Sequence, residues 1–274
     1  MKRKYIYPIL IIAVTVALFY IEKHVDRENE AYPNTSSESA KKAGFSSEFD
    51  STFLPTSTTG AIIKHAYFTL SYSEPHEQAE WVAYELAENH LSKNNFKRPY
   101  FVEDRDVSTK SADWRSYKNS GYDRGHLCPA GDRGFLFDAY HETFLTSNIS
   151  PQNHEFNAGI WNRLEQKVRY WARAYNGVYV ITGGVLEDGL KTIGDDRVAV
   201  PKEFYKIVVD RSDGKLKALA FLMSNEPSNA SFFDYVVPID LIESKTGIDF
   251  FSELPDTVEN KLEASINLKD WGKR

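Results

Sequence analysis

The chain has 274 residues, a formal net charge of -6 and a sequence pI of about 5.7. Its 42% hydrophobic and 26% charged residues are typical of a globular protein with one sizeable core. The acidic balance argues against a uniformly basic nucleic-acid-binding protein, although basic residues gathered at one site would remain compatible with it. The single cysteine excludes an intramolecular disulfide.

The N-terminal residues 1–24 have the pattern of a targeting segment. Lys2, Arg3 and Lys4 precede an apolar run over residues 5–21, which is at the short end of the length that spans a bilayer. No small-residue cleavage site follows the run, which favours an uncleaved signal anchor over a cleaved signal peptide. The positive-inside rule then predicts an exported domain on the periplasmic or extracellular side, anchored to the membrane, or secreted if the segment is cleaved.

Residues 25–59 are polar and rich in Ser, Thr, Glu and Lys, so they predict a linker. No internal repeat and no second linker follows. The sequence therefore predicts one domain over residues 60–273.

Several segments of this domain have clear secondary-structure patterns. Strands are predicted at residues 80–86, 178–186, 204–210 and 217–223, the last two joined by a hairpin-like turn. An apolar stripe of Ile160, Leu164, Val168 and Trp171 predicts a helix over residues 157–175, ended by Gly177. A short helix is predicted over residues 239–247. Strands on both sides of a long helix favour the α+β class over a regular βαβ alternation.

Residues 120–132, SGYDRGHLCPAGD, combine charged side chains with residues that favour turns. Arg124 offers a permanently charged guanidinium that fits phosphate or carboxylate oxygens, and His126 exchanges a proton near neutral pH. Asp123 is positioned to orient one of them. A base and a cation are what phosphodiester hydrolysis needs, although a structural turn explains this short motif equally simply. Cys128 is expected to be buried rather than catalytic.

A second polar segment, residues 146–171, contains asparagines around a predicted helix start. Asn157 and Glu165 are eight residues apart, so a regular helix places them on roughly one face. An asparagine carbonyl oxygen is a suitable ligand for a hard cation such as Mg²⁺, which retains several waters. The alternative is that Asn157 caps the helix and Glu165 is solvated.

Together, DRGH and the later SNISPQNHEFNAGIWNRLE resemble the DNA/RNA non-specific endonucleases of the ββα-metal (His-Me finger) group, which includes endonuclease G. The resemblance extends to KRPYF upstream and VYVITGG downstream, about 100 residues in all. It implies a central antiparallel sheet with flanking helices and a ββα-metal module made of a β-hairpin and a helix.

The resemblance also implies a role for each matching residue. His126 corresponds to the general base that activates water, and Arg124 to an arginine facing the scissile phosphate. Asn157 corresponds to the single direct protein ligand of a hydrated Mg²⁺, with Mn²⁺ as an alternative ion. Glu165 corresponds to an acid that positions water at the metal, and Asn148 to a polar residue beside the metal site.

Arg98, in KRPYF, is our choice for a second phosphate-binding arginine. Arg105 and Arg115 are rivals, because no motif fixes the alignment between them. Phe144 occupies a position where some relatives have another asparagine, so a wider asparagine cluster is not expected.

These features predict a Mg²⁺-dependent endonuclease that hydrolyses phosphodiester bonds of DNA and RNA through contacts to the phosphate backbone. A phosphodiesterase acting on small or lipid-linked diesters is an alternative. A third possibility is a catalytically silent surface receptor for nucleic acid, but binding alone would not need the histidine base.

Overall fold

The computed structural model describes residues 14, 16, 51–92, 94–212 and 215–272. The chain divides into two units, residues 1–35 and 36–274, and the fold below is that of the second unit. The predicted linker lies largely outside the described residues. Within them, Phe53 is already buried in the core, so packed residues occur on the N-terminal side of residue 60.

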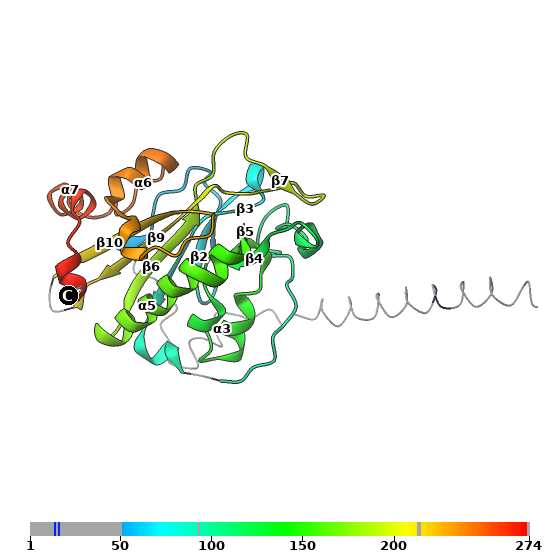
Figure 1. Cartoon of the computed structure of the whole chain (residues 1–274), viewed down its shortest axis with the longest axis horizontal. Helices are drawn as coiled ribbons and strands as arrows, with labels where there is room; N and C mark the ends of the chain where they lie inside the picture. The colour runs from blue at the N-terminus through cyan, green and yellow to red at the C-terminus, as the bar shows by residue number, and fades with distance from the viewer. Residues whose placement is uncertain (1–13, 15, 17–50, 93, 213–214, 273–274) are drawn as a thin grey trace, which may run out of the picture. The chain divides into compact units, whose positions relative to one another are not determined.

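A seven-stranded antiparallel sheet forms the centre of this unit (Figure 1). Neighbouring strands pair antiparallel throughout. In spatial order the strands are β1 (Ile62–Lys64), β2 (Thr69–Ser73), β3 (Gln78–Leu86), β6 (Val178–Gly184), β9 (Glu203–Asp210), β10 (Lys217–Ser224) and β11 (Val236–Val237).

Both faces of the sheet are buried, because side chains alternate along each strand and helices cover each side. On β3, Val82 and Tyr84 belong to one core cluster, and Trp81 and Ala83 belong to the other. The first cluster includes apolar residues of α5 (Asn162–Ala174). The second includes residues of α6 (Ile239–Thr246) and α7 (Asp256–Ala264). The result is a layer of helix on either side of the sheet.

The remaining elements are short. They are α3 (Phe137–Glu142), α4 (His154–Phe156), the hairpin of β4 (Asp123–His126) and β5 (Ile149–Gln152), and the hairpin of β7 (Thr192–Ile193) and β8 (Val198–Ala199). Single 3-10 turns connect many of the elements.

The predicted α+β class, with a central antiparallel sheet, is confirmed. The four predicted strands correspond to β3, β6, β9 and β10, and the short helix predicted near the C-terminus corresponds to α6. The long helix differs from the prediction. Residues 157–161 form a π-helical turn between α4 and α5, and Gly159 within it has non-helical φ and ψ angles. Such π turns are frequent at functional sites.

Candidate active site

The DRGH motif lies on a β-strand, although its glycines had suggested a turn. Asp123–His126 forms β4 and pairs with β5, so that His126 is opposite Ile149. The turn precedes the strand at Gly121, which has a φ of 85°. Because side chains alternate along a strand, Arg124 and His126 share one face of the hairpin.

Gly125 is needed for space rather than for backbone freedom. A Cβ atom at this position would lie 2.1 Å from Oε1 of Gln152 on the paired strand. Gln152 is fully buried, and both polar atoms of its amide lack a hydrogen-bond partner among the described residues. Only a residue without a Cβ atom leaves room for the Gln152 side chain, so Gly125 allows β4 and β5 to pair closely.

Arg98, Arg124 and His126 converge on the ring of Phe101. The guanidinium carbons of Arg98 and Arg124 lie 5.7 and 5.2 Å from the ring centre, and the His126 ring centre lies 5.6 Å away. Phe144 packs against the same cluster of side chains, since its ring centre lies 5.0 Å from that of His126. Neither arginine has an ion-pair partner among the described residues. Two cations without a carboxylate beside a histidine form a suitable site for an anion.

The environment of His126 keeps its imidazole neutral. Burial, together with the positive charge of Arg98, lowers the pKa of His126 to about 3. Its Nε2 is buried and has no hydrogen-bond partner within the described part of the chain. A neutral imidazole with an uncommitted nitrogen has the form that a general base requires.

A side-chain hydrogen bond to Asp123 connects Asn157 to β4. The Asn157 side-chain nitrogen donates a hydrogen bond to Oδ2 of Asp123 at 2.9 Å, and Nδ1 of His154 lies 2.9 Å from the same oxygen. Asn157 is the first residue of the π-helical turn. Because its nitrogen is committed to Asp123, its carbonyl oxygen is the atom that can bind a cation.

Glu165 belongs to a partly buried charged network that joins α5 to Asp132. Its Oε2 accepts a hydrogen bond from Arg169 at 3.3 Å, and Arg169 also pairs with the buried Asp132. Burial raises the pKa of Glu165 to about 7, against the opposing positive charges of Lys206 and Arg169. No described contact joins Glu165 directly to Asn157 or His126.

Lys206, which the sequence patterns did not single out, is a buried charge near this network, and its Nζ has no hydrogen-bond partner among the described residues. It is fully buried on β9, and its Nζ lies 4.7 Å from the ring centre of Trp161. Burial lowers the pKa of Lys206, and the negative charges of Glu165 and Asp132 oppose that effect. A lone lysine within the otherwise apolar run FYKIVV was the available signal, because buried charges are rare without a partner.

Asn148 holds the chain just after His126. Its Oδ1 accepts a hydrogen bond from the Cys128 amide at 2.8 Å, and its Nδ2 donates to the carbonyl oxygens of Cys128 and Thr143 at 3.0 and 2.8 Å. All of these contacts are to the main chain, so the geometry indicates a positioning role. Cys128 is buried, and burial raises the pKa of its thiol to about 12, which makes it a poor nucleophile.

The rival arginines differ in their surroundings. Arg115 pairs with Asp113 at 2.9 Å and lies over the ring of Trp114, whereas Arg105 is exposed. Arg124 also lies over Trp114, 5.6 Å from its ring centre, but of the three candidates Arg98 is the one that shares the Phe101 ring with both Arg124 and His126. Some other basic residues near the motifs are already committed. Arg163, for example, donates to the carbonyl oxygens of Ser228 and Ala230.

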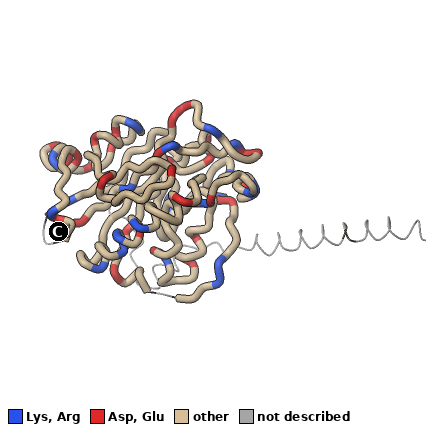
Figure 2. The backbone as a smooth tube through the Cα atoms, in the orientation of Figure 1, with Lys and Arg blue, Asp and Glu red and all other residues tan. Residues whose placement is uncertain are grey.

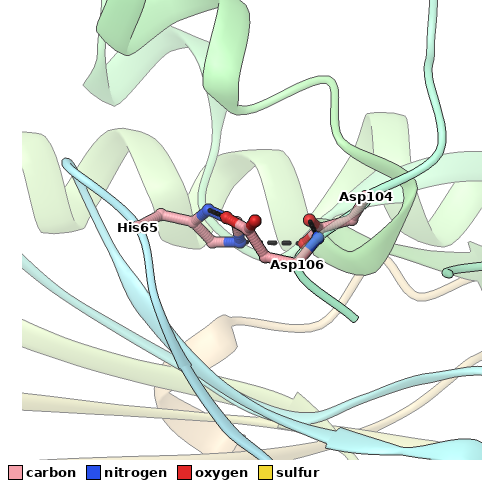
Figure 3. Close-up of side chains that lie close together, drawn as sticks. All are labelled: His65, Asp104 and Asp106. Atoms are coloured by element: carbon pink, nitrogen blue, oxygen red, sulfur yellow. Dashed lines mark hydrogen bonds and ion pairs between the residues drawn. The ribbon is translucent and has the colours of Figure 1, made fainter. Parts of the chain in front are cut away.

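His65, Asp104 and Asp106 form a separate group of potential metal ligands (Figure 3). Nε2 of His65 lies 2.8 Å from Oδ2 of Asp104, which also accepts a hydrogen bond from Ser147. Burial alone would lower the pKa of His65, but the hydrogen bond and charge of Asp104, with the charges of Glu142 and Asp106, raise it. These contacts describe a buried ion pair that attaches the segment following Phe101 to the turn between β1 and β2.

Comparison with known families identifies the chain. Residues 45–257 match the family described as DNA/RNA non-specific endonuclease. The chain belongs to the DNA/RNA non-specific endonuclease family. The resemblance inferred from DRGH and the downstream helix is confirmed.

Several proteins in this family are similar over most of the described domain. The mitochondrial nuclease EXOG of Danio rerio is 37% identical over 202 residues, which cover 68% of this chain and 59% of the relative. Human mitochondrial endonuclease G is 32% identical over 198 residues, or 67% of each chain. A crystal structure of EndoG with EndoGI aligns with a TM-score of 0.68 and 29% identity, covering 85% of this chain and 100% of that one. The chain thus spans less than two thirds of several curated relatives.

The prediction of an exported, membrane-anchored protein is contradicted by these comparisons. The similar proteins from zebrafish, frog, mouse, human and yeast are named as mitochondrial nucleases. Among the described residues, no helix is long and apolar enough to cross a membrane. Apart from Val14 and Val16, the apolar residues 5–21 behind the prediction lie outside the described part of the chain.

Proposed function

We propose that this chain is a metal-dependent endonuclease that hydrolyses phosphodiester bonds of DNA and RNA without reading their sequence. The observation that carries the proposal is the convergence of Arg98, Arg124 and His126 on Phe101. Family membership supports the same class of activity. Contacts to phosphate carry no base information, so this site suits cleavage at many sequences.

The two arginines bind the phosphodiester, and His126 acts on the attacking water. Arg98 and Arg124 have no ion-pair partner among the described residues, and burial with the charge of Arg98 lowers the pKa of Arg124. A bound phosphate relieves this repulsion between like charges. Nε2 of the neutral His126 then accepts the proton of the water as it attacks phosphorus.

The donor set near β4 fits a hard cation. Asn157 offers a carbonyl oxygen that is oriented because its nitrogen is held by Asp123. We assign Asn157 as the protein ligand of Mg²⁺, with Mn²⁺ as an alternative ion. When bound, such an ion stabilises negative charge on phosphate oxygens and on the leaving oxygen.

The surrounding residues act by positioning. Glu165 can accept hydrogen bonds from water near the metal, and Arg169 fixes one of its oxygens. Asn148 fixes the main chain at Cys128 and thereby the end of β4 that carries His126. Arg98, Arg124 and His126 therefore act on the substrate and the attacking water, whereas Glu165 and Asn148 hold other groups in place.

The proposal is tested with the purified chain, supercoiled plasmid, a long RNA and a small chromogenic diester. We expect both polymers to be cut with Mg²⁺, cutting to stop with EDTA, and activity to return when Mg²⁺ is restored. Preferential cleavage of the small diester would favour the alternative phosphodiesterase. Binding of DNA without any cleavage in Mg²⁺ or Mn²⁺ would favour the silent receptor.

A further inference from the structure

The segment that contains α6 and α7 concentrates negative charge far beyond the rest of the chain. Residues 239–264 contain seven Asp or Glu residues and two lysines, a net charge of -5, against -6 for all 274 residues. Figure 2 shows the acidic positions along these two helices. One of the two lysines, Lys245, is paired at 2.7 Å with Glu203, which lies outside the segment, so its charge is already engaged elsewhere.

Five of these carboxylates meet around Glu263. Asp240 and Glu243 are three residues apart on α6, and Glu259 and Glu263 are four apart on α7, so each pair shares a helix face. Oxygens of Asp240, Glu243 and Glu263 lie within 4.8 Å of one another, and so do oxygens of Asp249, Glu259 and Glu263. Glu263 is the member common to both groups.

Glu263 provides a second and separate indication of a ligand. The residue is only 6% exposed, and its Oε1 is buried without a hydrogen-bond partner among the described residues. A buried, unpaired carboxylate oxygen is costly unless a cation or a donor satisfies it. Burial and the negative charges of Glu243 and Glu259 raise the pKa of Glu263 to about 8. This direction agrees with a buried carboxylate that no cation or hydrogen-bond donor of the described residues satisfies.

We propose that Glu263 is the centre of a Ca²⁺ site that joins α6 to α7, separate from the nuclease site. Ca²⁺ takes six to eight oxygen ligands at about 2.3–2.6 Å and accepts several carboxylates in flexible geometry. Two oxygens on opposite sides of such an ion lie at most about 5 Å apart, in agreement with both groups. Mg²⁺ is less suitable, because it usually retains waters and uses only one or two carboxylates.

The site would also stabilise the start of the folded domain. The main chain of Asp249 exchanges hydrogen bonds with Thr56, whose amide donates to the Asp249 carbonyl oxygen at 2.9 Å. The Asp249 amide in turn donates to the Thr56 hydroxyl at 2.9 Å. Because Asp249 belongs to one of the two groups around Glu263, a cation bound there also connects the helices to the segment leading into β1.

The test compares thermal unfolding of the full chain in EGTA and in excess CaCl₂. We expect Ca²⁺ at about a hundredfold over its Kd to raise the Tm by roughly 5 °C or more. Glu263→Gln should lose this shift, yet be at least as stable as the wild type in EGTA, because it removes a repelled carboxylate. Equilibrium dialysis with CaCl₂ alone should find at least one Ca²⁺ fewer bound to Glu263→Gln.

Glu253→Gln is the matched control, since it removes the same charge from an exposed residue of the same segment outside the five carboxylates. It should retain the Ca²⁺ shift. If Glu263→Gln does not fold, the exposed Asp240→Asn takes its place and should weaken the shift. Equal Ca²⁺ shifts in the wild type and the variants, or no shift in the wild type, would overturn the proposal.

Discussion

His126 illustrates how its surroundings keep a histidine side chain neutral. The aromatic rings of Phe101 and Phe144 pack against its half-buried imidazole, whose Nε2 is buried, and Arg98 adds positive charge nearby. Both effects disfavour the imidazolium, so the pKa falls to about 3. In histidine NMR spectra of the metal-free protein, we expect His126 to stay neutral down to about pH 4. Titration of His126 at pH 6.5 or above would contradict this description.

Arg98 is the arginine that lies beside the proposed base. Removing a charged hydrogen bond to phosphate costs about 1.5–3 kcal/mol, so Arg98→Ala should lower kcat/KM on plasmid DNA by roughly 10- to 100-fold. Arg105→Ala removes the same charge from an exposed position and should remain near the wild-type rate. Equal losses in both variants would indicate a diffuse electrostatic effect instead of a specific contact.

At the scale of the element, the β4–β5 hairpin depends on the fit between Gly125 and Gln152. A methyl group at Gly125 would overlap the Gln152 side chain, and such overpacking typically costs about 1–3 kcal/mol. Gly125→Ala should therefore lower the free energy of unfolding by this amount in urea titrations. Adding Gln152→Ala should recover part of the loss. If the two substitutions destabilise additively, the overlap is not the cause.

The elements differ in how far the sequence predicts them. Strands β3, β6, β9 and β10 have period-2 or continuously apolar patterns, and these follow from burial on a sheet. The π-helical turn does not follow from any such pattern, because Ile160 and Trp161 within it are buried in the core as they would be in a regular helix. The motif residues were found in sequence, but Lys206 and its buried network become visible only when β9 and the helix pack together.

At the scale of the whole molecule, the His65–Asp104 ion pair connects two distant parts of the chain. The pKa of His65 is raised, so its contribution to stability is present below the ordinary value of about 6.5 and lost as the pH rises through the folded value. Burial acts to raise the pKa of Asp104, but His65 and Ser147 lower it overall. Its contribution is therefore present above about pH 4 and lost in acid.

Removing His65 should consequently have a pH-dependent cost. We expect His65→Ala to lower the free energy of unfolding by about 3 kcal/mol at pH 6, because Asp104 is left buried and unpaired, and by less at pH 9. Asp106→Asn changes a carboxylate that is 71% exposed and should cost less than about 1 kcal/mol. A cost of His65→Ala that does not vary with pH would rule out the ion pair as its source.

The proposed nuclease activity is tested most directly by the rate at which His126→Ala cuts plasmid DNA in Mg²⁺. Loss of a general base predicts a fall of about 10²- to 10⁴-fold in kcat, with thermal unfolding and DNA binding in EDTA unchanged. His76→Ala removes a histidine in the turn between β2 and β3, where its Nδ1 hydrogen-bonds Ser73, and should cut at the wild-type rate. Cleavage by His126→Ala at the wild-type rate would contradict the proposed role of His126.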